Sequence, residues 1–169
     1  MVSPVTRKVK ISGELSHLKI AVVIPSYKVS RHILGVVEGI GPECSTIYVV
    51  DDACPENSGK LVSEKIKLER VKVLFHEKNQ GVGGAVLTGY RQAILDGADI
   101  IVKIDGDGQM DTGLICKLIE PIESGRADYC KGNRFYNPSD LRQMPKIRLI
   151  GNTLLSFMTK ASSGYWNSF

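Results

Sequence analysis

The stretch DIIVKIDGDGQMD, residues 99–111, decides the expected fold. It opens with a short run of β-branched residues, which is typical of a buried strand. It ends in a polar turn that contains Asp105, Asp107 and Asp111. Carboxylates this close together repel one another unless a positive charge lies between them. The turn therefore suggests a divalent metal ion at the end of a strand.

The same pattern recurs along the chain. Short apolar runs that stop at polar residues predict strands at 18–24, 46–50, 71–75 and 99–104, and a weaker fifth strand at 127–132. Continuous apolar runs of this length are typical of strands that are buried on both faces of a parallel sheet.

Amphipathic segments between the strands predict helices at 30–40, 58–69, 83–96 and 112–123, with Asp111 as the N-cap of the last. Alternating strands and helices predict an α/β fold with a mostly parallel sheet. In such a fold the C-terminal ends of the strands form one edge, and ligands bind there. The polar turns after the strands are therefore expected to converge on one crevice. They are Ser26 and Tyr27, Asp51 and Asp52, Glu77 to Gln80, and Asp105 to Gln109.

Length and composition fit one soluble globular domain. The chain has 169 residues, 43% hydrophobic and 24% charged, and a net charge of +4, which is too small to indicate nucleic-acid binding. Residues 1–17 are expected to form a loose arm and residues 18–169 the domain. The sequence shows no signal-peptide pattern, and its longest apolar run, at 20–24, is far shorter than the ~20 residues of a membrane span. Four cysteines without C-x-x-C spacing suggest reduced thiols and a cytoplasmic location.

Basic residues dominate the segment 131–160. An anionic partner, either a phosphate group or a membrane surface, would explain this excess; a solvated face is the alternative. The helix expected at 146–161 carries an apolar stripe, which fits either an interfacial helix or part of the core. The segment contains one acid, Asp140, beside Lys131, Arg134, Arg142, Lys146, Arg148 and Lys160.

The Asp105-Gly106-Asp107 turn carries the clearest chemistry. Oxygen ligands suit Mg²⁺ or Mn²⁺, which bind few protein groups and complete their shells with water and phosphate oxygens. Gln109 offers a further oxygen. A Ca²⁺-binding EF-hand loop is excluded, because its sixth position must be Gly and is Met110. The remaining alternative is a polar turn with a capping role.

NQGVGGA, at 79–85, is a glycine-rich turn between a strand and a helix. It matches no Rossmann fingerprint. It also matches no P-loop, because Tyr90 stands where a P-loop has its lysine. Backbone N–H groups at such a helix start can bind an anion or a sugar hydroxyl, so Asn79, Gly81 and Gly84 are candidate binding residues. Close packing of the helix on the sheet is the alternative.

VVDDAC, at 49–54, ends a strand in two adjacent acids. Neighbouring side chains of a strand point in opposite directions, so one of Asp51 and Asp52 can face the crevice while the other braces the turn. The three histidines are scattered and predict no catalytic triad, which argues against a nucleophilic hydrolase.

Five motifs, in this order, resemble the family 2 glycosyltransferases, and most closely the branch related to dolichol-phosphate mannose synthase and polyprenyl-phosphate glycosyltransferases. They are IPSYK (24–28), VVDDAC (49–54), KNQGVGGAVLTGYRQAILDGAD (78–99), KIDGDGQMD (103–111) and KGNRF (131–135). The resemblance covers residues 18 to about 160. It implies a GT-A fold, a nucleotide-sugar donor such as a UDP- or GDP-sugar, and inverting transfer to a polyprenyl phosphate or a glycan.

The resemblance also implies roles for individual residues. Pro25, Ser26, Tyr27 and Gly106 would line the nucleotide site, and Asp51 or Asp52 would contact the base or ribose. The metal on the diphosphate, Mg²⁺ or Mn²⁺, would be held by Asp105 and Asp107, with Gln109 as a third ligand. Arg134, and also Arg148, would bind the acceptor phosphate.

Family members usually continue beyond a segment like 162–169, so the acceptor and membrane part of the protein is expected to be missing. Two alternatives remain open: a nucleotide-sugar-binding module without turnover, and a sugar nucleotidyltransferase. The second normally has a glycine- and arginine-rich loop after its first strand, which IPSYKVSR (24–31) lacks. If the enzyme acts on a lipid phosphate, it would work at the cytoplasmic face of a membrane.

Overall fold

A computed structural model of the chain describes residues 18–132, 155 and 157–158. The chain divides into two compact units, residues 1–130 and 131–169. The architecture below belongs to the first unit. In the second, Leu155, Phe157 and Met158 are helical.

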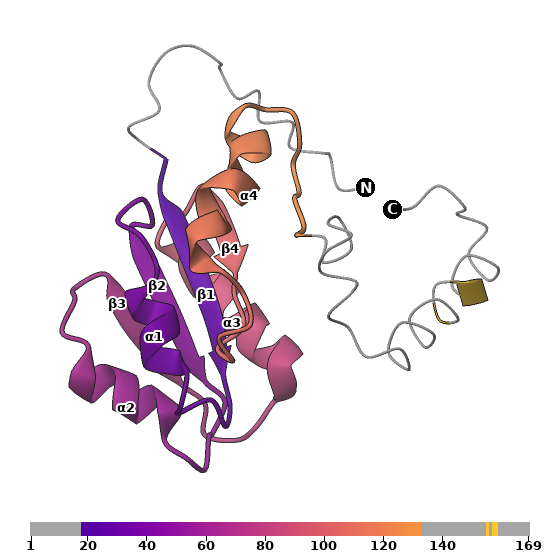
Figure 1. Cartoon of the computed structure of the whole chain (residues 1–169). Coiled ribbons are helices and arrows are strands. Elements are labelled where there is room, and N and C mark those ends of the chain that lie inside the picture. The colour runs from indigo at the N-terminus through magenta and orange to yellow at the C-terminus, as the bar shows by residue number, and fades with distance from the viewer. Residues whose placement is uncertain (1–17, 133–154, 156, 159–169) are drawn as a thin grey trace. The chain divides into compact units, whose positions relative to one another are not determined.

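The first unit is built on a sheet of four parallel strands in the order β3-β2-β1-β4 (Figure 1). The strands are β1 (Ile20–Ser26), β2 (Thr46–Asp51), β3 (Val71–Phe75) and β4 (Ile100–Lys103). All three strand pairs are parallel. After β3 the chain crosses to the other side of β1, so the strand order reverses between β1 and β4, and ligands bind at such a switch point.

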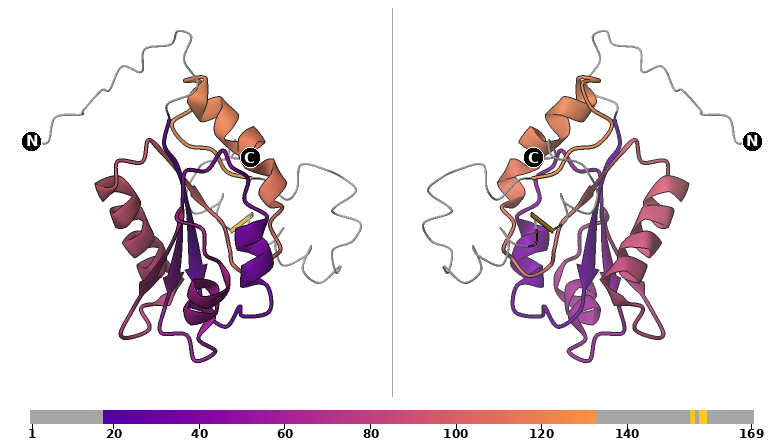
Figure 2. Two further views of the ribbon diagram at one scale, coloured as in Figure 1. Left: turned by 90° about the vertical axis from the view of Figure 1, so that its left-hand side faces the viewer. Right: turned by 90° about the vertical axis from the view of Figure 1, so that its right-hand side faces the viewer.

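Helices cover both faces of the sheet (Figure 2). One face carries α1 (Ile33–Glu38), α2 (Ser58–Lys65) and α4 (Ile115–Glu123), the last preceded by the 3₁₀ turn η1 (Thr112–Leu114). The other face carries α3 (Gly81–Leu95). The predicted α/β architecture is therefore confirmed.

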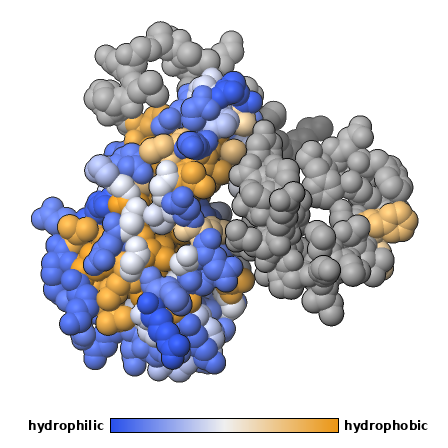
Figure 3. All heavy atoms as spheres, in the orientation of Figure 1, coloured by the Kyte–Doolittle hydropathy of each residue, from blue (hydrophilic) through white to orange (hydrophobic). Residues whose placement is uncertain are grey.

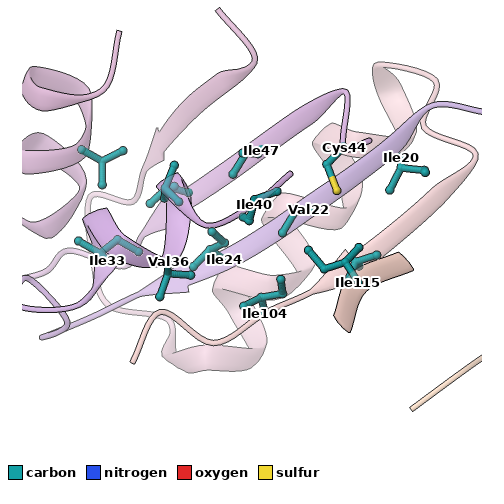
Figure 4. Close-up of a cluster of buried hydrophobic side chains, with 14 of the residues drawn as sticks. Ile20, Val22, Ile24, Ile33, Val36, Ile40, Cys44, Ile47, Ile104 and Ile115 are labelled. Carbon is teal, nitrogen blue, oxygen red and sulfur yellow. The ribbon is translucent and has the colours of Figure 1, made fainter. Parts of the chain in front are cut away.

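Two cores follow from the alternation of side chains along β1. Ile20, Val22 and Ile24 point to the face covered by α1, where Figure 4 shows them among buried side chains of neighbouring elements. Ala21 and Val23 pack on the opposite face, beneath α3. On the first face, apolar residues are visible between the polar outer surfaces of the helices (Figure 3). Because both faces of the central strands β1 and β2 are buried, these two strands are mainly apolar rather than alternating, whereas the edge strand β3 is half exposed.

Helix α3 lies against the sheet at a glycine. A Cβ atom added to Gly89 would lie 2.3 Å from a methyl carbon of Val23 and 3.2 Å from one of Val50. No side chain fits at this point, and the helix can approach the strands closely only because residue 89 is glycine.

The first four predicted strands and the four helices predicted between 30 and 123 are confirmed with small shifts of their ends. The fifth predicted strand is wrong. Residues 127–132 form no strand, and the side chain of Tyr129 is 77% exposed. ADYCKG contains one aromatic residue and no β-branched one, so it offers little to pack on a sheet. Asp111 is confirmed as a cap, since its carboxylate accepts the N–H of Gly113 at 2.9 Å. Within the described part of the chain, no helix is long and apolar enough to cross a membrane.

Candidate functional site

A cavity of about 380 Å³ opens at the C-terminal edge of the sheet. It lies where the chain leaves β1, β2 and β4 and enters α3, which includes the switch point between β1 and β4. Its lining contains most of the residues that the sequence marks as donor-binding. The lining residues are Pro25, Ser26, Tyr27, Val29, Asp52, Asn79, Gly81, Val82, Ala85, Asp105, Gly106 and Asp107.

Both acids of the D-x-D turn line this cavity. The glycine between them lies in a tight place, since a Cβ at Gly106 would lie 3.1 Å from Ile33 and 3.3 Å from the carbonyl oxygen of Pro25. Gly108 adopts a φ of 75°, which glycine accepts at little cost. The turn is thus pressed against the loop after β1, and both carboxylates are held at the rim of the sheet.

Each of these carboxylates already has a partner. Asp105 forms an ion pair with Lys103, the last residue of β4. Asp107 accepts the backbone N–H of Gln109 at 3.0 Å. The side chain of Gln109 is exposed and does not line the cavity.

The donor set fits a hard divalent ion that carries other ligands. Residues 18–132 contain no group of three or more His, Cys, Asp or Glu side chains that could hold a metal by themselves. Asp105 and Asp107 supply two carboxylates at the cavity wall, and Mg²⁺ is commonly bound by one or two carboxylates together with substrate phosphates. These residues could hold Mg²⁺ or Mn²⁺ together with a diphosphate.

Asp51 and Asp52 divide the two roles that the sequence left open. Asp51 braces the turn: its carboxylate accepts the N–H of Cys54 at 2.7 Å and that of Gly59 at 2.6 Å. It does not line the cavity. Asp52 lines the cavity and is only 2% exposed. Among these two acids, Asp52 is the one placed to meet a ligand.

Asp52 is held as an anion by several donors. Its Oδ1 accepts the N–H of Gln80 at 2.8 Å and lies 2.7 Å from Nδ1 of His76. Burial alone would raise the pKa of Asp52, but the hydrogen bonds from Gln80 and His76 outweigh it and lower that pKa.

The glycine turn before α3 is shaped by its own side chains. Asn79 donates to the carbonyl of Asp52 at 3.2 Å and accepts the N–H of Gly81 at 3.0 Å. Gly81, with a φ of 77°, lines the cavity. Gly84 does not; a Cβ there would lie 2.5 Å from Cβ of Gln80. Close packing at Gly84 and ligand access at Gly81 therefore coexist in one turn.

The loops after β1 and β2 contain unusual backbone conformations. Lys28, Ala53 and Asn57 have φ values of 56°, 53° and 52°, a region that residues other than glycine rarely adopt. The strained loops are joined where the N–H of Lys28 donates to the sulfur of Cys54 at 3.1 Å. Residues in such conformations cluster at ligand-binding sites, and these loops frame the cavity beside Tyr27.

The sequence reading missed His76, which it counted among scattered histidines. Its ring lies between Asp52 and Thr88, with Nε2 2.9 Å from the Thr88 hydroxyl. Strand pairing could have revealed this contact. Asp51 pairs with Phe75, so the next residue of each strand, Asp52 and His76, emerges at the same point. Arg134 and Arg148, the predicted acceptor-phosphate residues, lie outside the described residues, as does most of the basic segment 131–160.

Comparisons with known proteins agree with this geometry. A model of the family described as Glycosyl transferase family 2 matches residues 21–169. UDP-N-acetylglucosamine–dolichyl-phosphate N-acetylglucosaminyltransferase of Methanococcus voltae is 34% identical over 161 residues, which cover 87% of this chain and 64% of that protein. Polyprenol monophosphomannose synthase of Mycolicibacterium smegmatis is 28% identical over 133 residues, which cover 76% of this chain and 50% of that protein.

Among solved structures, S. aureus TarS in complex with UDP aligns with 61% of this chain and 32% of its own, at 20% identity and a TM-score of 0.48. The chain spans 64% and 50% of the lengths of the two relatives above. The family match covers most of the chain, and the parallel sheet flanked by helices agrees with it. The protein therefore has the predicted GT-A fold and belongs to glycosyl transferase family 2.

Proposed function

We propose that this protein is the donor-binding part of an inverting, metal-dependent glycosyltransferase that moves a sugar from a UDP- or GDP-sugar to a polyprenyl phosphate. The observation that carries the proposal is the shared cavity at the switch point, lined by Asp52 after β2 and by Asp105 and Asp107 after β4, on opposite sides of β1. A nucleotide-sugar donor needs an anionic group that accepts hydrogen bonds from the nucleoside. It also needs carboxylates that can hold a metal ion on the diphosphate.

The cavity residues divide naturally between the parts of the donor. Asp52, as a carboxylate, accepts hydrogen bonds from a base N–H or a ribose hydroxyl. Pro25, Ser26 and Tyr27 form the neighbouring wall of the cavity. At the opposite wall, Asp105 and Asp107 would hold Mg²⁺ or Mn²⁺, and a bound ion of this kind neutralises the charge that develops on the leaving diphosphate.

The reaction is a displacement at the anomeric carbon. An oxygen of the acceptor forms a new bond to this carbon as the bond to the diphosphate breaks, and the bonding electrons leave with the diphosphate. Attack from the side opposite the leaving group inverts the anomeric configuration. A lipid phosphate is already an anion near neutral pH, so this transfer needs no general base, whereas a sugar hydroxyl must lose a proton to one.

The ion-pair and hydrogen-bond partners of the acids that line the cavity favour a lipid phosphate as the acceptor substrate. Within the described residues, three carboxylates line the cavity, and each is engaged: Asp52 with His76, Asp105 with Lys103, and Asp107 with the N–H of Gln109. A general base must be able to take up a proton; the hydrogen bonds to Asp52 lower its pKa, so it does so poorly, and Asp105 and Asp107 would be occupied by the metal ion. The similarity to a dolichyl-phosphate N-acetylglucosaminyltransferase and to a polyprenol monophosphomannose synthase supports the same choice.

An acceptor with a polyprenyl chain resides in a membrane, so the enzyme would act at the cytoplasmic face of one. The basic residues of 131–160 are suited to contact its anionic lipids or the acceptor phosphate. Arg134 and Arg148 are the residues we assign to that phosphate.

Calorimetric titration tests the donor site directly. UDP and GDP are titrated with and without Mn²⁺ into the wild type, into Asp107→Ala, and into Asp99→Asn as a matched control. Asp99 accepts the N–H of Lys19 at 3.0 Å at the start of β4, the opposite edge of the sheet. We expect Mn²⁺-dependent binding of one nucleotide that is lost only in Asp107→Ala.

The acceptor is tested by supplying the matching nucleotide sugar with either a polyprenyl phosphate or an uncharged glycoside. Transfer to the lipid phosphate alone is the expected result. If a folded wild type binds neither nucleotide, the donor-site proposal is wrong. Nucleotide binding without transfer to any acceptor would instead identify a binding module, and formation of nucleotide sugar from a nucleoside triphosphate would identify a nucleotidyltransferase.

A further inference from the structure

His76 is buried behind the candidate donor site and connects three elements of the fold. Its side chain is 6% exposed, and that of Asp52 is 3% exposed. Nδ1 lies 2.7 Å from the Asp52 carboxylate at the end of β2, and Nε2 lies 2.9 Å from the hydroxyl of Thr88 within α3. The backbone N–H of His76 also donates to the carbonyl of Asp51 at 2.9 Å. The ring is therefore fixed at both nitrogens, and its backbone is fixed to the residue before Asp52.

The partners of the His76 ring determine which of its nitrogens carries the hydrogen. An ionised carboxylate only accepts hydrogen bonds, so the hydrogen must lie on Nδ1 of His76. In the neutral ring Nε2 then accepts the O–H of Thr88. In the cation, Nε2 donates to the oxygen of the same hydroxyl. In both states Nδ1 and Nε2 of His76 keep their hydrogen bonds, so the ring keeps the same orientation.

The arrangement also fixes Asp52. Its Oδ1 is held from two directions, by the ring of His76 and by the N–H of Gln80 at 2.8 Å. Asp52 lines the cavity, whereas His76 and Thr88 do not. A buried carboxylate that is held in one rotamer presents a fixed acceptor, and a ligand then loses no affinity to ordering it.

A purely structural link between β3 and α3 would not need these groups. Apolar side chains of similar volume would join the two elements without the cost of desolvating a carboxylate and an imidazole. The hydrogen-bonded series Thr88–His76–Asp52 instead ends at the cavity-lining acid that follows β2. Side chains that orient a binding group in this way are typical of the layer behind ligand sites.

We infer that His76 and Thr88 are positioning residues for the nucleoside of the donor: through the chain Thr88–His76–Asp52 they hold the Asp52 carboxylate in the orientation that receives a hydrogen bond from the base or ribose. This inference rests on the proposed function, because it assumes that the cavity binds a nucleotide. It concerns the nucleoside alone. The diphosphate is expected to bind at Asp105 and Asp107, so its affinity should not depend on the hydrogen bonds between Thr88, His76 and Asp52.

The test separates the two parts of the ligand. UDP, GDP and inorganic pyrophosphate are each titrated with Mn²⁺ into the full 169-residue chain, and the tighter nucleotide is used for the variants. His76→Ala is expected to weaken nucleotide binding roughly tenfold, the effect of losing one charge-assisted hydrogen bond. Pyrophosphate binding is expected to remain within about twofold of the wild type, a factor well below that of one such bond.

Conservative variants identify which contact matters. The amide nitrogen of His76→Asn can replace Nδ1 as donor to Asp52, so this variant should recover most of the affinity. His76→Gln places its amide near the position of Nε2 and should not. Thr88→Val removes the hydroxyl at almost constant volume and should weaken nucleotide binding by about threefold, less than one whole hydrogen bond, whereas Thr88→Ser should behave as the wild type.

Thr46→Val, at the start of β2 on the opposite edge of the sheet, is the matched control for the hydroxyl deletion. Thermal unfolding of every variant shows that the titrated protein is folded. Equal losses for nucleotide and pyrophosphate, or nucleotide binding by His76→Ala and Thr88→Val at wild-type affinity, overturn the inference and leave the proposed function intact. Binding of neither nucleotide by the folded wild type overturns both.

Discussion

Asp51 and Gly59 are in contact so close that a Cβ at residue 59 does not fit without a shift. The N–H of Gly59 donates to Oδ2 of Asp51 at 2.6 Å, and a Cβ on Gly59 would lie 2.6 Å from Cβ of the aspartate and 2.7 Å from that oxygen. Gly59 lies in the first turn of α2. The contact therefore fastens the start of this helix to the end of β2.

Gly59→Ala is expected to lower the free energy of unfolding by about 1–3 kcal/mol, the usual cost of forcing atoms into a closely packed site. Urea denaturation measures the loss. Ser63→Ala, on the exposed side of the same helix, provides the control for a change that alters helix composition alone. An unchanged midpoint for Gly59→Ala would show that α2 can move away from the strand without cost.

Adjacent acids at the end of β2 should respond differently to the same substitution. Asp51→Asn replaces an oxygen that accepts a buried N–H, so we expect a loss of about 1–3 kcal/mol in the free energy of unfolding, with nucleotide affinity preserved in the folded fraction. Asp52→Asn should weaken nucleotide binding, because Asp52 alone of the two lines the cavity. Calorimetry and urea denaturation on both variants distinguish the roles, and the reverse pattern would contradict the assignment.

The fold and the convergence of the polar turns on one cavity were predictable because they depend on local sequence. Buried parallel strands have continuous apolar runs, and polar turns follow them. The segment 99–111 therefore predicted a strand and, after it, a ligand-binding edge of the sheet. The weaker segment 127–132 failed because a strand also needs a partner and side chains that pack, and its composition supplies neither. Ligand binding by the cavity residues stays a prediction.

The division of labour between Asp51 and Asp52 could not be predicted in the same way. It depends on which carboxylate meets the start of α2 and which meets His76 after β3, 24 residues along the chain. Gly89 is a similar case: it has the P-loop spacing from Gly84, a motif that Tyr90 in place of the lysine excludes, and only its neighbours show that it permits α3 to lie on β1. Contacts between elements, rather than local pattern, decide such roles.

Gly89→Ala is therefore expected to destabilise the protein by about 1–3 kcal/mol, since its Cβ would lie 2.3 Å from Val23. Gly35, within α1, is the contrasting position: a Cβ there meets nothing within 4 Å. Gly35→Ala should stabilise the protein by about 0.5–1 kcal/mol, the difference in helix propensity. Opposite shifts of the urea midpoint are predicted, and a loss of stability at both positions would refute the argument from packing.

The low pKa of Asp52 predicts how stability depends on pH. Because this pKa is lower in the folded protein than in the unfolded chain, the contribution is complete above roughly pH 4, the pKa of an unfolded aspartate. It is lost as the pH falls through the lower folded-state value. The stability difference between the wild type and Asp52→Asn should thus be constant above about pH 5 and shrink below about pH 4. A difference that shrinks between pH 7 and 5 would indicate a raised pKa instead.

Lys103 is the ion-pair partner of Asp105, one of the two carboxylates that we assign to the divalent cation. The two side chains form an ion pair and are 30% and 33% exposed, so the lysine competes with the metal for the same carboxylate. A partly exposed pair contributes roughly 0.5–1 kcal/mol. Lys103→Met removes the competitor and should therefore raise the affinity for Mn²⁺ about two- to fivefold, measured by titration of Mn²⁺ in the absence of nucleotide.

Lys72→Met is the matched control for this change. Lys72 pairs with Asp96 at 2.5 Å, with similar exposure of 48% and 31%, and neither residue lines the cavity. The two substitutions change the net charge equally, so a gain in Mn²⁺ affinity shared by both would reflect general electrostatics. A gain confined to Lys103→Met would mean that Asp105 exchanges its lysine for the metal. Weaker Mn²⁺ binding in Lys103→Met would show that the lysine helps to orient Asp105 rather than compete for it.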